Sequence, residues 1–515
     1  MKKIMKMKII FITALYSFIF LNTYAQTSSD DLTLAKIKNI GYQQSMVKQM
    51  TYEMADVYGQ RLTGSREYLA AAKWASAKMK EAGLINVHFE NFCTDCRGWN
   101  VKNFNVELLS PNYMHIVAYP LAWTKSTKGI VEGDVVNIES FTDMNLLKQH
   151  YGGKLKGKII LLGKEPMLKS LPDTVFKRFS KVQLEDMQER LVPQIKVIPM
   201  PKQLEIWHDE YFNDNAFLQF VESEGAIAVF KTSSSVAGIV NVAGTYYYKD
   251  NDPKPLPYFI IMPEHAGRII RLLKQNIIPR IKLNLETIFY NEPDNNVNII
   301  GEITGSDANL KSEVILIGGH FDSWHTASGA TDNGGNCMVL LEALRILKES
   351  GLMPKRTIRL AFFGGEEEDF NGSIGYATRH FGNLNSKPNS ESQKVAAYLN
   401  LDNGMGAIRG IYLQGNEFAR PVFEEVFRRF SSTQQYYTTI ENKLDNDHLT
   451  FDYYKIPAFQ FIQDPLDYRP VTHHTQLDLP EYAPEADMMK NAVMVAWTIY
   501  SLATGEKMVP RKMKN

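Results

Sequence analysis

Short apolar runs that end on charged residues dominate the hydrophobic pattern of the second half of the chain. Residues 313–318, 357–363 and 395–401 are three such runs. Continuous apolar runs of this length predict strands buried on both faces, which is typical of parallel sheets. Between the first two runs, apolar residues recur at helical spacing over residues 337–349. The pattern therefore predicts an alternation of strand, helix and strand.

The pattern predicts further helices and strands on both sides of this region. Further helices are expected over residues 68–80, 180–191, 265–275, 419–430 and 487–503, and further strands over residues 86–92, 128–131, 158–162, 224–230, 257–263, 296–303 and 458–462. Residues 125–290 differ from the rest, because short strands and glycine-rich turns replace the regular alternation. We expect this block to be inserted into a larger α/β domain.

The predicted fold class is α/β, with a central, mixed, mostly parallel sheet flanked by helices and a β-rich insertion. A turn-rich segment near residues 292–294 marks the end of the insertion. We assign residues 26–124 to the first part of the main domain, residues 125–292 to the insertion and residues 293–515 to the main part. Two domains, or one domain with a large insertion, are expected because about 490 residues exceed what one core of ~100–200 residues usually holds.

Residues 1–25 have the pattern of a cleaved secretory signal. Four lysines precede an apolar run from Ile9 to Leu21, and Thr23 to Ala25 offer a cleavage site. The run is shorter than the ~20 residues that span a bilayer. We expect an exported protein, secreted or periplasmic, without a stable membrane span once the signal is removed. An uncleaved anchor is the alternative.

The balance of charged residues argues against some classes of binding partner. The chain has 57 basic and 57 acidic residues, so no net charge favours nucleic acid or a charged membrane surface. Three cysteines are too few for a disulfide scaffold. Cys93 and Cys96 are expected to form a local disulfide or to remain thiols, and a redox motif is disfavoured because no strand and helix flank them. Cys337 is expected in the core.

Candidate chemistry gathers where the predicted strands end. His320 and Asp322 follow the first apolar run, Glu366 and Glu367 follow the second, and Asp402 follows the third. The carboxyl ends of parallel strands meet at one edge of a sheet, which is where open α/β sheets place their sites. So many carboxylates at one edge require a compensating positive charge, and a divalent metal supplies it most simply.

Two further residues complete a set of two imidazoles and three carboxylates, as expected of a site with two Zn²⁺ ions that performs hydrolysis. The candidate metal ligands are His320, Asp332, Glu367, Asp402 and His474. A water held between the ions would be the nucleophile. Glu366 is the candidate general base, and Asp322 is expected to accept the second ring N–H of His320.

Several polar residues near the candidate ligands are expected to have roles other than metal binding. His325 and His473 are expected to lie beside the site or at the surface rather than to bind metal. His448 is expected to satisfy a loop carbonyl. Glu368 and Asp369 extend the acidic run, and we expect both to be solvated.

At these positions the chain resembles the M28 family of metallopeptidases, and within it the plasma glutamate carboxypeptidase (carboxypeptidase Q) branch. The matching motifs are Gly318 to Trp324, Gly329 to Gly335, the pair Glu366 and Glu367, Asn400 to Asp402, and His474 to Asp478. The resemblance implies a zinc-exopeptidase fold of the phosphorylase/hydrolase-like kind, in which the insertion is a protease-associated domain. It also implies a homodimer.

The resemblance also implies which candidate ligands bind each of the two zinc ions. It implies that one zinc takes His320 and Asp402, that the other takes Glu367 and His474, and that Asp332 bridges the two. The expected function is therefore a secreted exopeptidase with two zinc ions, acting on short peptides as an aminopeptidase, carboxypeptidase or dipeptidase.

Three alternatives remain open. A glutaminyl cyclase-like zinc acyltransferase shares a stretch like Phe362 to Glu367, but the large insertion argues against it. A non-catalytic, receptor-like relative is disfavoured because every candidate ligand is present. A metal-independent hydrolase is disfavoured because no Gly-x-Ser-x-Gly motif accompanies the histidines.

Overall fold

The computed structural model describes residues 29–140, 143–167, 176–431 and 434–512. For residues 208–214 it describes the backbone only. The predicted secretory signal, residues 1–25, lies outside the described residues. Among the described helices, none is both long enough and apolar enough to cross a bilayer.

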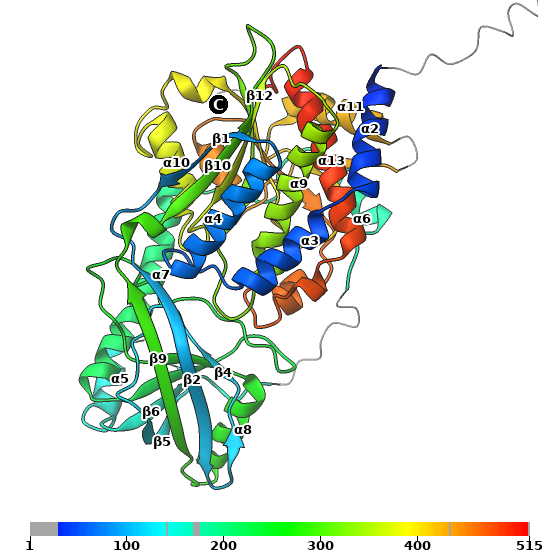
Figure 1. Cartoon of the computed structure of the whole chain (residues 1–515). Helices are drawn as coiled ribbons and strands as arrows, with labels where there is room; N and C mark the ends of the chain where they lie inside the picture. The colour runs from blue at the N-terminus through cyan, green and yellow to red at the C-terminus, as the bar shows by residue number, and fades with distance from the viewer. Residues whose placement is uncertain (1–28, 141–142, 168–175, 432–433, 513–515) are drawn as a thin grey trace, which may run out of the picture.

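A mixed sheet of eight strands forms the larger body, drawn in the upper part of Figure 1. Its strands, in spatial order, are β1 (Ile85–Asn91), β10 (Val297–Ile303), β12 (Thr357–Phe363), β11 (Val314–His320), β13 (Val395–Asn400), β16 (Ala458–Gln463), β14 (Ile408–Tyr412) and β15 (Tyr437–Thr439). The four central strands β12, β11, β13 and β16 run parallel. Antiparallel pairs flank them on both sides, and the edge strand β15 runs parallel to β14. The predicted fold class is confirmed, because helices flank this sheet on both faces.

The helices of the larger body cover the two faces of the sheet unequally. On one face pack α2 (Ser29–Gln43), α3 (Val47–Tyr52), α4 (Arg66–Glu81), α9 (Gly335–Glu349) and α13 (Glu485–Thr504), and on the other face α10 (Asn371–Phe381) and α12 (His448–Tyr453). Helix α9 is buried on nearly all sides, which agrees with its almost wholly apolar sequence. Cys337 is buried in this helix, as predicted.

A second sheet of eight strands forms the smaller body, in the lower part of Figure 1. Its spatial order is β3 (Met114–His115), β2 (Gly98–Ser110), β9 (Arg280–Tyr290), β5 (Val131–Ile138), β6 (Lys158–Leu162), β7 (Ala228–Thr232), β8 (Tyr258–Ile261) and β4 (Ala118–Pro120). Helices α5 (Met144–Tyr151) and α8 (Pro263–Lys274) belong to the same body. The division into domains at residues 125 and 292 stays a prediction, and so does the protease-associated character of the insertion.

The sequence pattern missed or displaced several elements. The long paired strands β2 and β9 were not predicted, because both carry polar residues on their exposed faces. The strand predicted at residues 128–131 lies instead at Val131–Ile138. Helix α7 (Met200–Ser223) was also missed, because its apolar residues do not form one continuous stripe. Of residues 165–215 only the helix near 180–191 was predicted, and it is α6 (Lys181–Glu189).

Ion pairs attach the segment that contains α6 to the larger body. Arg178 pairs with Asp464 at 3.0 Å and with Asp487 at 2.7 Å, and Arg190 pairs with Glu441 at 3.0 Å. All three carboxylates are buried, so the pairs are better shielded from solvent than ordinary surface pairs. The start of α7 packs against the larger body, where Met200 lies in one apolar cluster with Phe370 and Leu449.

Cys93 and Cys96 form a disulfide, with Cα atoms 5.6 Å apart. Both cysteines lie in the short connection between β1 and β2, at the passage from the first sheet to the second. The expectation of a local disulfide or two thiols thus resolves to the disulfide.

Candidate metal centre

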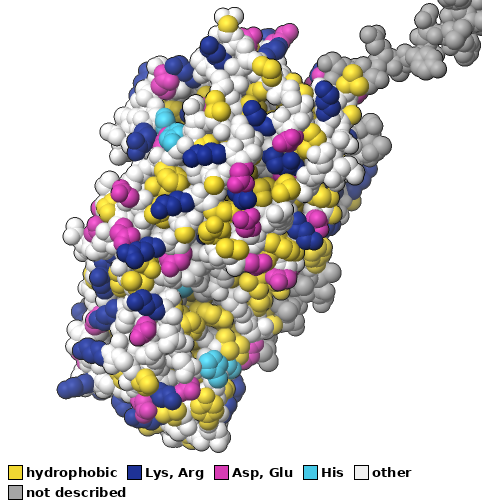
Figure 2. Space-filling model, viewed as in Figure 1, with side chains coloured by type: hydrophobic (Ala, Val, Ile, Leu, Met, Phe, Trp, Pro, Cys, Tyr) yellow, Lys and Arg dark blue, Asp and Glu magenta, His cyan; other side chains and the backbone are white. Residues whose placement is uncertain are grey.

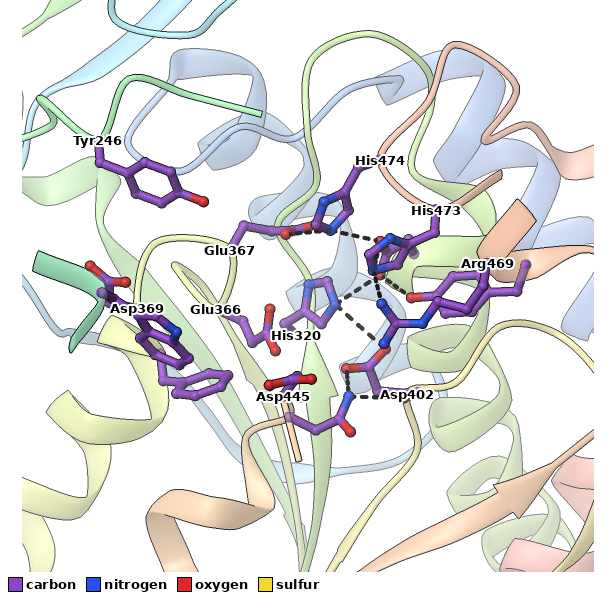
Figure 3. Close-up of a pocket in the computed structure, with 15 residues that line it drawn as sticks. Tyr246, His320, Glu366, Glu367, Asp369, Asp402, Asp445, Arg469, His473 and His474 are labelled. Atoms are coloured by element: carbon purple, nitrogen blue, oxygen red, sulfur yellow. Dashed lines mark hydrogen bonds and ion pairs between the residues drawn. The ribbon is translucent and has the colours of Figure 1, made fainter. Parts of the chain in front are cut away.

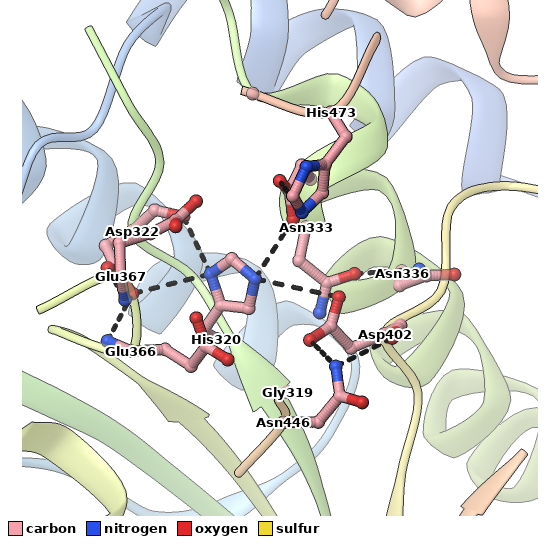
Figure 4. A network of polar contacts seen from close by, with 12 residues as sticks. Gly319, His320, Asp322, Asn333, Asn336, Glu366, Glu367, Asp402, Asn446 and His473 are labelled. Carbon is pink, nitrogen blue, oxygen red and sulfur yellow. Dashed lines mark hydrogen bonds and ion pairs between the residues drawn. The ribbon is translucent and has the colours of Figure 1, made fainter. Parts of the chain in front are cut away.

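His320 is the last residue of β11, at the carboxyl edge of the parallel strands. Its ring Nε2 lies 3.3 Å from Asp332 Oδ1 and 3.7 Å from Asp402 Oδ1 (Figure 4). Asp402 follows the neighbouring parallel strand β13, and Asp332 lies in the loop before α9. Three segments distant in sequence therefore meet at one imidazole.

A second imidazole faces the same carboxylate from the other side. The Nε2 atom of His474 lies 2.9 Å from Glu367 Oε2 and 3.4 Å from Asp332 Oδ2. Glu367 follows β12, and His474 lies in the loop after β16. The carboxylate of Asp332 thus lies between His320 and His474, with one oxygen toward each. The five side chains predicted as metal ligands converge on one region.

The donor atoms of this group fit divalent cations. Asp332 Oδ2, Glu367 Oε1 and Asp402 Oδ1 are buried and have no hydrogen-bond partner within the described part of the chain. A buried, unpartnered carboxylate oxygen is costly unless a cation compensates its charge. His320, Asp332 and Glu367 place one possible ligand atom each within 4.8 Å of one another. His320 and Asp402 do the same with Glu366.

Glu366 is held by Asp322 through its main chain. The backbone N–H of Glu366 donates to Asp322 Oδ1 and the backbone N–H of Glu367 to Asp322 Oδ2, both at 3.3 Å. The second ring nitrogen of His320, Nδ1, lies 3.1 Å from the main-chain carbonyl of Asp322 and 3.6 Å from its carboxylate. Asp322 therefore orients both the turn after β12 and the imidazole after β11.

The electrostatic surroundings of Glu366 favour its protonated form. Burial raises the pKa of this carboxyl well above its usual value, and the negative charge of Asp402 adds to the rise while His320 opposes it. A carboxylate with a raised pKa is suited to accept and return a proton near neutral pH.

Further polar residues fix the carboxylates in place. Tyr468 donates its hydroxyl hydrogen to Asp332 Oδ1 at 2.8 Å. Asn446 donates to the main-chain carbonyl of Asp402 at 2.9 Å and also to its carboxylate. Asp478 accepts from the Thr331 hydroxyl at 2.8 Å, next to Asp332. Sequence reasoning missed Tyr468 and Asn446 as site residues, because neither lies in a motif that points to metal.

Arg61 also supports the site, and the sequence analysis did not identify it. Its buried guanidinium donates to the carbonyls of Phe321 at 2.7 Å, Ser328 at 2.7 Å and Gly329 at 2.8 Å. Gly329 has φ +60°, and a Cβ there would lie 2.3 Å from Ser323 Cβ, so only glycine fits. Arg61 thus shapes the loop between the first histidine and the central aspartate.

The converging side chains line a cavity of about 270 Å³ (Figure 3). Trp207 of α7 and Phe370 form an aromatic wall, with ring centres 5.5 Å apart. His473 lies in the same cavity and stacks on His474, with ring centres 3.8 Å apart, and its Nε2 is 3.9 Å from Asp332 Oδ2. The imidazole of His474 has closer contact with two carboxylates, which favours His474 over His473 as a metal ligand.

Two acidic residues differ from expectation. Glu368 is 1% exposed and Asp369 is 8% exposed, so the prediction that both are solvated was wrong. Asp369 has φ +66° and Phe370 has φ +60°, so the chain bends inward before α10 instead of continuing into solvent. Asp369 accepts a hydrogen bond from the Tyr248 hydroxyl at 3.3 Å. A linear acidic run carries no signal of such a bend.

Two other histidines form hydrogen bonds with main-chain carbonyls. His448 Nε2 lies 3.0 Å from the carbonyl of Lys443, as predicted. His325 Nε2 lies 2.7 Å from the carbonyl of Pro120, and its ring meets Trp99 edge to face. Neither imidazole belongs to the cavity lining.

The fold and this arrangement of imidazoles and carboxylates define the class of protein, a metal-dependent hydrolase. Residues 298–499, which carry all the candidate ligands, match the model of peptidase family M28. This match, together with the relatives described next, confirms the resemblance to the M28 metallopeptidases that the motifs predicted.

Known relatives match nearly the whole chain. Carboxypeptidase Q of Homo sapiens is 26% identical over 470 residues, 89% of this chain and 85% of that protein. Carboxypeptidase Q of Mus musculus is 24% identical over 460 residues, covering 89% and 86%. Among solved structures, a peptidase M28 precursor from Shewanella amazonensis has a TM-score of 0.66 at 20% identity, covering 94% of this chain and all of its own. BSAP, a zinc aminopeptidase from Bacillus subtilis, has a TM-score of 0.56 at 18% identity, covering 89% and 95%.

Proposed function

We propose that this protein is an exported exopeptidase that binds two zinc ions and hydrolyses short peptides. The proposal is supported most directly by Asp332, whose two carboxylate oxygens face His320 at 3.3 Å and His474 at 3.4 Å. A carboxylate shared between two imidazoles, each with a further carboxylate beside it, is the arrangement expected of a site for two metals. The names of the relatives, carboxypeptidase and aminopeptidase, support an exopeptidase.

The ligand roles follow the contacts. We assign His320 and Asp402 to one zinc, Glu367 and His474 to the other, and Asp332 to both. Bound zinc would supply Lewis acidity, which lowers the pKa of water and polarises the scissile carbonyl.

The remaining chemistry belongs to the chain's own residues. Glu366 takes a proton from the attacking water and delivers it to the nitrogen of the leaving amine, while Asp322 holds the Glu366 backbone and the His320 ring. Trp207 and Phe370 form the aromatic wall of the cavity and exclude water from one side.

The test is the substitution Glu366→Gln, which keeps the side-chain volume and removes the base. We expect the variant to bind the same amount of zinc as the unchanged protein and to lose at least about 100-fold in kcat. Metal content by elemental analysis and hydrolysis of a dipeptide panel are the measurements. Glu391→Gln, at an exposed position, is the matched control. Retained turnover would exclude Glu366 as the base, and absence of zinc in active protein would exclude the metal assignment.

Export has its own test. The basic and apolar residues before Ala25 support removal of a signal peptide. Sequencing the amino terminus of protein recovered outside the cytoplasm should give Gln26 as the first residue. A protein that retains Met1 would contradict cleavage.

A further inference from the structure

Arg469 is the one lysine or arginine among the described residues that line the cavity. It lies on the short helical turn η6 (Tyr468–Thr472), just before the two adjacent histidines, and Figure 3 shows its guanidinium beside the carboxylate-rich floor. Nη1 donates to His473 Nε2 at 3.2 Å, and the guanidinium lies 5.7 Å from the centre of the Tyr468 ring. Its contacts are therefore with an imidazole and a phenol.

The position is unusual because carboxylates surround it. The same cavity is lined by six of them, Asp332, Glu366, Glu367, Asp369, Asp402 and Asp445. Within the described part of the chain, no ion pair joins Arg469 to any of the six. Arginines elsewhere in the larger body do pair, for example Arg356 with Glu313 at 2.6 Å and Arg409 with Asp464 at 3.0 Å. The protein thus does not use Arg469 to balance its own charge.

Lys443 is a second cation that feels the charge of Arg469. Burial lowers the pKa of its ammonium group and Arg469 adds to this effect, while Asp445 and Asp402 oppose it. Like charges repel, so an anion bound beside Arg469 would relieve part of this repulsion. Arg469 also keeps hydrogen-bond donors available, because a guanidinium has five N–H groups and one of them meets His473.

We propose that Arg469 binds a carboxylate of the substrate and thereby selects peptides that carry one on the residue released by hydrolysis. The inference rests on the proposed peptidase function. The planar fork of a guanidinium matches a carboxylate with two parallel hydrogen bonds, which a lysine cannot reproduce. The carboxylate has two possible sources, the carboxyl terminus of the released residue or an acidic side chain on it.

The experiment compares substrates that differ only in the carboxylate. Ala-Leu against Ala-Leu-amide tests the carboxyl terminus, and Ala-Glu-amide against Ala-Gln-amide tests the side chain. The unchanged enzyme, Arg469→Gln and Arg469→Lys are assayed for kcat/KM, with Arg428→Gln on an exposed helix face as control. We expect the unchanged enzyme and the control to favour the acid of one pair by about 10- to 100-fold, the value of one or two hydrogen bonds to a charged group.

The variants then separate recognition from a structural role. With Arg469→Gln the preference for the acid should fall below about threefold, while turnover of the amide should stay nearly unchanged, and Arg469→Lys should be intermediate. Gln keeps an N–H donor but is shorter and uncharged, whereas Arg469→Lys keeps the charge without the planar fork. If Arg469 only held His473 in place, the loss would be equal for acid and amide, and this outcome overturns the proposal. An unchanged preference in the variant overturns it as well.

Binding of a free amino acid distinguishes failure of this inference from failure of the proposed function. Calorimetry with zinc-loaded protein compares leucine with leucinamide for the carboxyl terminus, and glutamic acid α-amide with glutaminamide for the side chain. The acid of one pair should bind about tenfold tighter, and Arg469→Gln should abolish the difference. If this result appears in a protein that hydrolyses no peptide, the proposed function fails and the assignment of Arg469 stands. If peptides are hydrolysed and the two members of each pair bind alike, the assignment of Arg469 fails alone.

Discussion

At the scale of single residues, Arg61 shows how the site depends on a side chain that never reaches substrate. Its guanidinium is buried among main-chain carbonyls, and no carboxylate pairs with it within the described residues. Each of these hydrogen bonds involves a charged donor, so each contributes more than a neutral one.

We expect Arg61→Lys to lower the free energy of unfolding by about 2–4 kcal/mol, since an ammonium group cannot reach the carbonyls of Phe321, Ser328 and Gly329 at once. Urea denaturation measures the change. Arg428→Lys is the control, with an expected change within about 0.5 kcal/mol. A loss as small as the control's would show that the loop holds its shape without Arg61.

His325 predicts a dependence of stability on pH. Burial lowers its pKa from the usual 6.5 to about 4. Between these values the unfolded chain binds a proton that the folded chain does not, so stability is complete above pH 6.5 and falls as the pH drops toward 4.

The measurement for His325 is the free energy of unfolding at pH 7 and pH 4.5. His325→Gln keeps an N–H for the Pro120 carbonyl and cannot titrate, so its stability should fall less over this range, by about 2 kcal/mol. Parallel loss in the variant and the unchanged protein would assign the acid sensitivity to other groups.

At the scale of elements, a loop of the second sheet supports the histidine loop of the first. The backbone N–H of Val242 donates to the carbonyl of His474 at 2.7 Å, and Asn241 donates from its side chain to the carbonyl of His473 at 3.0 Å. The residues between β7 and β8 therefore position one of the proposed metal ligands, although they lie more than 200 positions earlier in the chain.

Asn241→Ala should weaken zinc binding by about tenfold, the low end of what loss of a residue supporting a metal ligand produces. Competition with a chelator of known affinity measures it. Asn309→Ala, on an exposed turn, is the control. Unchanged zinc affinity in Asn241→Ala would show that the Val242 contact is sufficient.

The strands also show where the hydrophobic pattern predicts an element correctly. Strands β11, β12 and β13 are continuous apolar runs and were predicted within a few residues, because burial on both faces leaves no polar positions. Strand β2 has the burial pattern of a half-exposed strand, and its register with β9 depends on a partner about 180 residues away. Local sequence does not encode such a partner, so this pair was missed.

At the scale of the whole molecule, charge is evenly distributed on the visible face. Figure 2 shows basic and acidic side chains interspersed over both bodies, in agreement with the balance of 57 and 57. This face therefore carries no large patch of a single sign that would attract an oppositely charged partner. The homodimer stays a prediction, and sedimentation of the purified protein tests it.

Removal of metal should destabilise the whole protein. The unpartnered oxygens of Asp332, Glu367 and Asp402 repel one another without a cation, so binding zinc to the folded state alone stabilises it. At a zinc concentration 100 times Kd we expect about 2.7 kcal/mol per site relative to chelated protein. Thermal unfolding with chelator and after zinc is restored measures the difference. An equal melting temperature in both states would argue against a structural contribution of metal.

Local sequence was enough to predict the parallel core of the first sheet and the segments that carry the candidate ligands, because buried strands and motif residues can be recognised from neighbouring residues alone. It gave no sign that Glu368 and Asp369 turn inward, that Arg61 and Asn241 support the site, or that Arg469 faces six carboxylates without pairing with them. These features arise from contacts between segments far apart in the chain, whose distances and solvent exposure are set by packing in the folded protein.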